Sequence, residues 1–221
     1  MTYRSTNPFT NKVEKSFDEL SDQQLQVKLQ AAQDCFENTW RGQSFAQRKL
    51  VLKRTAALMR ERQQSLAELA TREMGKLIAQ SVGEVALSAA IIDYYADNAE
   101  AFLASQTLKT DKGHAVVESS PVGVVFGVEP WNFPYYQIAR FAAPNLMAGN
   151  VVMVKHASNV PQCALAFEQL MHDAGLPHGG YTNLFVSKDQ VSAVIDDKRV
   201  RGVALTGSEA AGAVVAARAG Q

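Results

Sequence analysis

A short segment of the chain combines an asparagine and a tryptophan with two prolines, directly after an apolar run. The segment consists of Glu129, Pro130, Trp131, Asn132, Phe133 and Pro134. Proline restricts the backbone torsion φ, so the two prolines hold the residues between them in a defined shape. Such rigidity suits a functional side chain that must keep a fixed position. The alternative is an ordinary proline-bounded turn with an aromatic plug, and the segment alone fits both interpretations.

Two further segments place polar groups at the ends of apolar runs. Lys155 and Ser158 offer a cation and a hydroxyl, which suit a ribose or a phosphate. Gly207 and Ser208 lead directly into a helical stretch, where backbone amides and a hydroxyl form a ready site for an anion. Each segment also has a simpler interpretation. A lysine at a strand end is usually just solvated, and Gly-Ser before a helix is a common turn and N-cap.

The first half of the chain is predicted to be mostly helical. Ser21 with Gln24 and Ser44 with Gln47 form capping-box patterns, and each pair precedes apolar residues at helical spacing. Gly75 is a plausible helix end. Helices are therefore expected over 22–39, from Ser44 to about 59, from about 66 to Gly75 and from about 79 to 102.

The pattern changes after this helical part. Residues 107–120 are rich in Val, Thr and Ser around a central glycine, which predicts an extended hairpin. Apolar runs then alternate with helical stretches, which is typical of a parallel sheet covered on both faces. Strands are expected over 122–128, 151–154, 182–186 and 203–205, and helices over 136–148, 161–174, 190–195 and 209–219.

The predicted fold class is therefore α/β, with a doubly wound, Rossmann-like parallel sheet preceded by an N-terminal helical segment. We divide the chain into a helical part at 1–106, an extended arm at 107–121 and a Rossmann-like part at 122–221. In a doubly wound sheet the ligand lies at the carboxyl ends of the strands. The polar segments described above all follow strands, so they are expected at this edge.

Composition excludes several classes of function. Lys plus Arg and Asp plus Glu number 22 each among 221 residues, so no net field attracts nucleic acid or an anionic membrane. The apolar runs are too short to span a membrane, and the polar N-terminus does not resemble a secretory signal. We expect a cytoplasmic protein. Its two cysteines have no metal-ligand spacing with the histidines, so we expect no metal site.

Taken together, the motifs resemble the aldehyde dehydrogenase family. They occur in that family's order and spacing over nearly the whole chain, and the likeness extends to Met74-Gly75-Lys76 and Gly83-Glu84-Val85 in the helical part. The succinate-semialdehyde dehydrogenase branch is the most similar. The motifs are Pro121-Val122-Gly123-Val124-Val125, Pro130-Trp131-Asn132-Phe133-Pro134, Ala148-Gly149-Asn150, Val154-Lys155, Ala174-Gly175-Leu176-Pro177 and Thr206-Gly207-Ser208.

The resemblance implies a role for each matching residue. Asn132 would donate its amide to the oxyanion that forms when a cysteine thiolate attacks an aldehyde. Trp131, together with Glu129 and Pro130, would line the nicotinamide end of an NAD or NADP site. Lys155 would reach the adenosine ribose or its phosphate, with Ser158 beside it. Ser208 would contact the pyrophosphate, where Gly207 lets the backbone approach closely.

Two departures from the family pattern concern the cofactor. Many members have a glutamate where this chain has Ser158, and that carboxylate would repel a 2′-phosphate. Without it, we expect NADP to be accepted as well as NAD. Ser187 replaces the glycine that usually follows the third strand, which puts the adenine edge of the site in question.

The resemblance covers only the opening part of the family, so we expect its catalytic domain to be absent. The parent would oxidise a small aldehyde, succinate semialdehyde, to the acid through a cysteine thiohemiacetal, whereas this chain alone should be inactive. Cys35 and Cys163 are expected to be small core residues rather than nucleophiles. Surface or loop positions are expected for His114, His156, His172 and His178.

Two alternatives belong to other classes of function. The chain could be a non-catalytic nucleotide-binding module or truncated gene product, and a stop codon after Gln221 would favour this interpretation. A structural domain without a ligand is disfavoured by the many polar strand ends. The arm at 107–121 resembles the oligomerisation strands of the family, so we expect a homo-oligomer.

Overall fold

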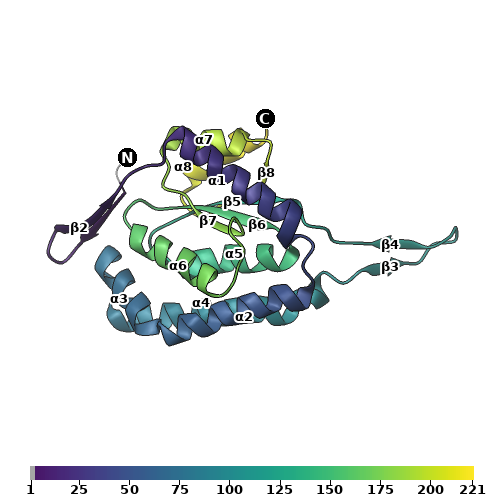
Figure 1. Cartoon of the computed structure of the whole chain (residues 1–221), viewed down its shortest axis with the longest axis horizontal. Helices are drawn as coiled ribbons and strands as arrows, with labels where there is room; N and C mark the ends of the chain where they lie inside the picture. The colour runs from purple at the N-terminus through teal and green to yellow at the C-terminus, as the bar shows by residue number, and fades with distance from the viewer. Residues whose placement is uncertain (1–2) are drawn as a thin grey trace.

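A parallel four-stranded sheet lies at the centre of the second half of the chain (Figure 1). The computed structural model describes residues 3–221. The strand order is β7-β6-β5-β8, and every neighbouring pair is parallel. This confirms the predicted parallel sheet. Its strands are β5 (Val124–Glu129), β6 (Val151–His156), β7 (Tyr181–Asn183) and β8 (Val200–Leu205).

Helices cover both faces of the sheet, as the alternating apolar pattern predicted. The helices that cross from β5 to β6 and from β6 to β7 lie on one face, and the next two lie on the other together with α1 (Figure 1). The winding therefore reverses between β5 and β8. These helices are α5 (Tyr136–Ala148), α6 (Pro161–Asp173), α7 (Lys188–Asp196), α8 (Glu209–Ala219) and α1 (Asp22–Cys35).

Helices α2, α3 and α4, which follow α1 in the first half of the chain, form a further layer outside α5 and α6 (Figure 1). Both predicted capping boxes are present, at Ser21 and Ser44, and Gly75 ends its helix with the left-handed φ of 77°. The predicted helix over 22–39 is α1 followed by a π-helical turn, η1. The elements after α1 are η1 (Phe36–Trp40), α2 (Phe45–Glu61), α3 (Gln63–Met74) and α4 (Ile78–Phe102).

One hydrophobic core joins the helical layer to the sheet. Helix α4 packs against α5, and buried residues of α1 to α4 belong to the same cluster as the central strands. The Trp40 side chain is buried and donates through Nε1 to the Leu146 carbonyl at 3.1 Å. The helical part thus supports the sheet from behind α5.

The predicted arm is an antiparallel hairpin of β3 (Gln106–Leu108) and β4 (Ala115–Val117), which extends away from the rest of the chain (Figure 1). Its apolar side chains Leu108, Val116 and Val117 are between 44% and 50% exposed. The hairpin therefore places exposed apolar side chains far from the core.

A second hairpin, which the sequence analysis did not predict, precedes the helices of the first half. Strands β1 (Tyr3–Asn7) and β2 (Lys12–Phe17) pair antiparallel. Asn7 shapes the turn, because its side-chain oxygen accepts from the Phe9 amide at 3.0 Å. The Tyr3 hydroxyl donates to the Val186 carbonyl and accepts from the Val186 amide. The hairpin is therefore bonded to the segment that follows β7.

Within residues 3–221, every helix is too short or too polar to cross a membrane. The limits of the four strands also differ from the prediction: β5 runs over 124–129 rather than 122–128, and β8 begins at Val200 rather than at 203. Strand β6 continues through Lys155 and His156, and β7 is only three residues long, although Leu184 still donates to the Val154 carbonyl at 2.8 Å. The extra residues of β6 carry one of the predicted site residues into the sheet itself.

Candidate functional site

A groove opens where the winding of the sheet reverses, between the ends of β5 and β8. One wall is the loop after β5, which we call the Asn132 loop (residues 130–135). The other wall is the loop after β8, which we call the Ser208 loop (residues 206–208). The groove is lined by Pro130, Trp131, Asn132, Gln137, Thr206, Gly207 and Ser208.

The topology accounts for the position of this groove. Adjacent strands β5 and β8 send their following helices to opposite faces, so their loops diverge and leave a crevice between them. The Thr206 amide donates to the Val128 carbonyl at 3.0 Å, which joins the roots of the two loops. Asn132 and Ser208 therefore face a common crevice, although 76 positions separate them in the sequence.

The Ser208 loop has the features of an anion site. Ser208 is the N-cap of α8, and its Oγ accepts from the Ala211 amide at 3.3 Å. The hydroxyl keeps its own hydrogen as a donor, and the first amides of the helix have no partner in the helix itself. Gly207 is exposed and leaves room for a ligand beside the backbone. These groups suit a phosphate or pyrophosphate.

On the opposite wall, aromatic and amide groups face the solvent in the groove. Trp131 is 50% exposed and Asn132 is also exposed, whereas Pro134 is buried. The loop thus presents its functional side chains outward from a buried base. An exposed amide on a fixed backbone can donate to an anionic oxygen in the groove.

Glu129 lies beneath this wall rather than in the groove. It is 3% exposed, and it lines an adjoining hollow with Gln137 and Arg140. Burial raises the pKa of its carboxyl to about 8, although a hydrogen bond to Thr206 and the charge of Arg140 both act in the opposite direction. The carboxyl therefore retains its proton at neutral pH and connects the roots of both loops.

Lys155 and Ser158 lie along the same edge of the sheet but outside the groove. The Lys155 ammonium lies 5.6 Å from the centroid of the Tyr3 ring, and burial lowers its pKa. The Ser158 carbonyl accepts from the Arg4 amide at 3.0 Å. The N-terminal hairpin, which the sequence analysis missed, thus borders this part of the edge.

His156 corrects the expectation that all four histidines are surface or loop residues. It is fully buried at the end of β6, on the same face of the sheet as Val152 and Val154. Its Nδ1 accepts from the Ala157 amide at 2.9 Å, which leaves Nε2 to donate to the Pro134 carbonyl at 2.8 Å. Burial lowers the pKa of the imidazole to about 4, so the ring is neutral. His114, His172 and His178 are exposed.

Gln137 and Thr206 line the groove, although they were not among the predicted site residues. Gln137 is buried in α5, and its Oε1 has no hydrogen-bond partner among residues 3–221. A glutamine in an otherwise apolar stretch of α5 is a signal that could have identified it. Thr206 could have been found because it directly precedes the Gly-Ser pair.

Cys35 and Cys163 are both buried free thiols, as predicted. Burial raises the pKa of Cys35 to about 11 and that of Cys163 well above its ordinary value. A thiol must lose its proton to act as a nucleophile. Neither cysteine is therefore suited to attack a substrate.

The comparison with protein families explains the grouping of these residues. The model of the aldehyde dehydrogenase family matches residues 1–221, the whole chain. The chain belongs to the aldehyde dehydrogenase family. This confirms the resemblance inferred from the motifs.

Known relatives of this aldehyde dehydrogenase chain point to one branch of the family. The succinate-semialdehyde dehydrogenase [NADP(+)] of Deinococcus radiodurans is 45% identical over 99% of the chain. A probable succinate-semialdehyde dehydrogenase [NADP(+)] of Synechocystis is 42% identical over the full chain. The solved succinic semialdehyde dehydrogenase of Streptococcus pyogenes, in complex with NADP+, has a TM-score of 0.96 and 47% identity over 99% of the chain.

The matched region is only part of each relative. The chain covers 46% and 49% of the two curated relatives and 48% of the Streptococcus pyogenes chain. The chain thus spans about half the length of the relatives it matches.

Proposed function

We propose that this chain is the cofactor-binding portion of an NADP-accepting succinate-semialdehyde dehydrogenase. The observation that supports it most is the shared groove, in which the Asn132 amide faces the Ser208 helix terminus. An amide donor and an anion site across one crevice suit a dinucleotide with a reacting carbonyl at its nicotinamide end. The names of the relatives supply the aldehyde and the cofactor.

Each wall of the groove has a separate task in this proposal. Ser208 and Gly207 hold the pyrophosphate, while Trp131 and Pro130 line the nicotinamide end above the buried Glu129. When bound, the nicotinamide supplies hydride-accepting chemistry. Asn132 stabilises negative charge on the aldehyde oxygen, and loss of one such donor typically raises the barrier by about 3 kcal/mol.

The residues at the end of strand β6 determine the choice of cofactor. Ser158 adds no charge where a carboxylate would repel a 2′-phosphate, and Lys155 supplies a cation nearby. NADP and NAD are therefore both accepted, in line with relatives that are named as NADP(+) enzymes. The N-terminal hairpin borders this end through Tyr3 and Arg4.

Cofactor binding can be tested directly by calorimetric titration of the 221-residue chain with NADP+ and with NAD+. We expect both to bind. The substitution Ser158→Glu should weaken NADP+ binding by about tenfold or more through charge repulsion and leave NAD+ binding nearly unchanged. Asn159→Glu adds the same charge one residue further along and is the matched control. Equal losses for both cofactors in the Ser158 variant would contradict the assignment.

The second candidate function is nucleotide binding without turnover by this chain. The two buried, protonated cysteines favour it, because they leave the described residues without an activated nucleophile. The chain mixed with NADP+ and succinate semialdehyde should form no NADPH. Formation of NADPH that Asn132→Ala abolishes would show that the covalent step occurs in this chain.

The hairpin arm is the proposed surface for self-association. Its exposed apolar residues Leu108, Val116 and Val117 project from the body, and its strands have free edges. Light scattering should show a dimer or larger assembly. Replacing Val116 and Val117 with lysine should shift the chain toward monomer, whereas a monodisperse wild-type monomer would exclude this role.

A further inference from the structure

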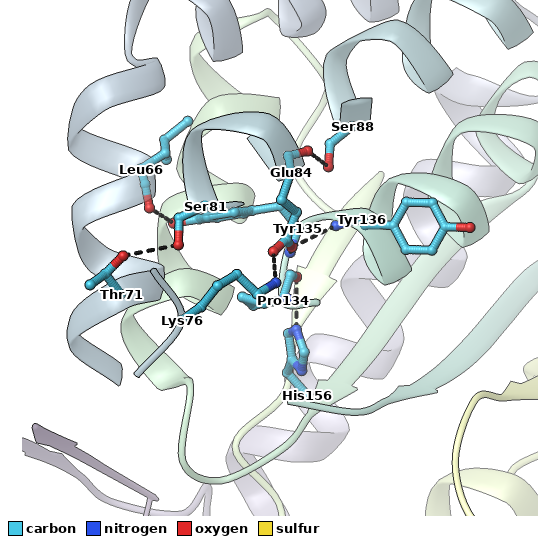
Figure 2. A network of polar contacts seen from close by, with 10 residues as sticks. All are labelled: Leu66, Thr71, Lys76, Ser81, Glu84, Ser88, Pro134, Tyr135, Tyr136 and His156. Carbon is cyan, nitrogen blue, oxygen red and sulfur yellow. Dashed lines mark hydrogen bonds and ion pairs between the residues drawn. The ribbon is translucent and has the colours of Figure 1, made fainter. Parts of the chain in front are cut away.

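A buried ion pair lies directly behind the Asn132 loop and takes no part in the groove itself. Lys76 and Glu84 form this pair, and their side chains are only 7% and 1% exposed. Lys76 comes from the link between α3 and α4, and Glu84 lies within α4 (Figure 2). Residues from the helical layer thus approach the loop that carries the proposed oxyanion donor.

The Glu84 carboxylate holds the end of the loop. Its Oε1 accepts from the Tyr135 amide at 2.8 Å and from the Tyr136 amide at 3.2 Å (Figure 2). These amides begin α5, whose N-cap Tyr135 provides no side-chain bond of its own. Glu84 therefore supplies from another helix the acceptor that a capping residue would normally provide.

Lys76 holds the middle of the same loop. Its ammonium lies 3.7 Å from the centroid of the Phe133 ring, which follows Asn132 directly in the sequence. A cation over an aromatic face is attracted to it, and the attraction is stronger in a desolvated site. The same ammonium is paired with Glu84, so one ion pair restrains both sides of Pro134.

Other contacts fix the pair in its place. Ser88 donates to the Glu84 carbonyl at 2.8 Å, and the Tyr135 hydroxyl donates to the Leu66 carbonyl at 3.0 Å. On the side of the sheet, His156 Nε2 donates to the Pro134 carbonyl (Figure 2). The base of the loop is therefore bonded to α3, α4 and β6 at once.

Burial of two charges carries a desolvation penalty that their attraction often fails to offset. A well-packed apolar pair would provide comparable stability, but it could not accept the two amides or attract the ring. We propose that Lys76 and Glu84 are positioning residues, which fix the Asn132 loop so that its amide and Trp131 face the groove. This inference rests on the proposed function of Asn132.

The test compares two volume-matched double variants of the 221-residue chain. The variant Lys76→Met with Glu84→Leu removes the ion pair, the ring contact and both amide bonds. The variant Lys76→Met with Glu84→Gln also removes the charges but keeps an oxygen for the amides. Lys76→Arg keeps the charge and should preserve the wild-type loop. Lys53→Met with Asp97→Leu is the control, because it removes an exposed ion pair that joins α2 to α4, the helix that also carries Glu84.

Hydrogen exchange of residues 130–136 reports the order of the loop without any cofactor. We expect about tenfold faster exchange in the leucine double variant, a smaller increase in the glutamine double variant, and wild-type rates in Lys76→Arg and the control. Acrylamide quenching should follow the same order. It reports mainly on Trp131, since Trp40, the other tryptophan, is 1% exposed.

NADP+ titration separates this inference from the proposed function. The positioning role is wrong if the wild type binds NADP+ but the loop of the folded leucine variant exchanges within twofold of the wild-type rate. If loop exchange changes as expected but the wild type does not bind NADP+, the positioning role stands and the proposed function fails. If the leucine variant does not fold, the single variants Glu84→Gln and Lys76→Arg decide. Faster loop exchange in Glu84→Gln, with wild-type exchange in Lys76→Arg, supports the inference. Unchanged loop exchange in Glu84→Gln overturns it.

Discussion

The two walls of the groove are held in different ways. The Asn132 loop rests on buried side chains, which include Glu84 of α4 and His156 of β6. The Ser208 loop leads into α8, a helix without a single buried residue. It follows β8, which is an edge strand and is only partly buried. One wall is embedded in the core, whereas the other lies at the margin of the sheet.

This difference shows that the chain builds one side of the groove more firmly than the other. Local stability depends on buried apolar contacts and protected hydrogen bonds, and both are concentrated behind the Asn132 loop. The anion site depends mainly on a single strand pairing with β5 and on the Ser208 cap. The following predictions test how far the two walls behave as separate units.

The largest expected effect concerns Glu129, the residue that connects the walls through Thr206. Its folded pKa of about 8 lies above the ordinary value of 4.5, so the protonated form is favoured by folding. This contribution to stability is fully present below about pH 4.5 and is lost as the pH rises through about 8. Glu129→Gln cannot ionise. Its free energy of unfolding should rise relative to wild type by on the order of 4 kcal/mol between about pH 5 and pH 9.

Urea unfolding at several pH values measures this difference. The positive charge of Arg140 lowers the pKa of the Glu129 carboxyl. Arg140→Gln should therefore raise this pKa further and move the loss of stability to higher pH. If wild type and Glu129→Gln showed parallel pH profiles, the carboxyl would not be buried as described, and the two walls would lack this connection.

The second prediction compares matched truncations behind each wall. Leu146 in α5 is fully buried, and Leu146→Ala should reduce the free energy of unfolding by about 3 kcal/mol through the lost contacts and the cavity. Val214 in α8 is 71% exposed, and Val214→Ala should change the free energy of unfolding by less than about 0.5 kcal/mol. Urea denaturation of both variants is the measurement. Similar losses would show that α8 is packed as firmly as α5.

The third prediction adds one methyl group to each strand. A Cβ at Gly127 in β5 would lie 2.6 Å from Phe141 Cε1, so Gly127→Ala should cost about 2 kcal/mol through overpacking. A Cβ at Gly202 in β8 would meet only Val125 Cγ1, at an ordinary 3.7 Å. Gly202→Ala should be neutral or stabilising by about 0.5 kcal/mol. Thermal unfolding of the two variants distinguishes a tight strand from a loose one, and equal shifts would remove the distinction.

Local patterns allowed most of the fold to be predicted. The helix limits of α5 and α8 matched, because each has clear apolar spacing between a strand and a glycine. The N-terminal hairpin was missed because Tyr3 and Ser5 are its buried residues, and a lone Tyr-Ser alternation is too short to indicate a strand. Its stability comes from distant contacts such as the bond between Tyr3 and Val186, which no local pattern reveals.

The groove was predictable because its residues follow strands directly, but the support behind it was not. Lys76 and Glu84 attracted notice only as a family motif, and His156 was placed at the surface because the strand was expected to end at Val154. The ion pair and the imidazole contact residues that lie tens of positions away in the sequence. Tertiary packing alone determines that they meet the Asn132 loop.

The smallest expected effect concerns the Ser208 cap itself. Ser208→Ala removes the bond to the Ala211 amide, and loss of such a cap costs about 1 kcal/mol of helix stability. Because α8 has no buried residue, we expect this loss to appear as faster amide exchange in the first turn of α8, with little change in global unfolding. Ser44→Ala, at the cap of α2, should instead lower the free energy of global unfolding by a similar amount, because α2 contributes Leu52 and Met59 to the core. Hydrogen exchange combined with urea denaturation separates the two results. A global loss in Ser208→Ala would show that α8 unfolds together with the core, and the contrast between the walls would then be wrong.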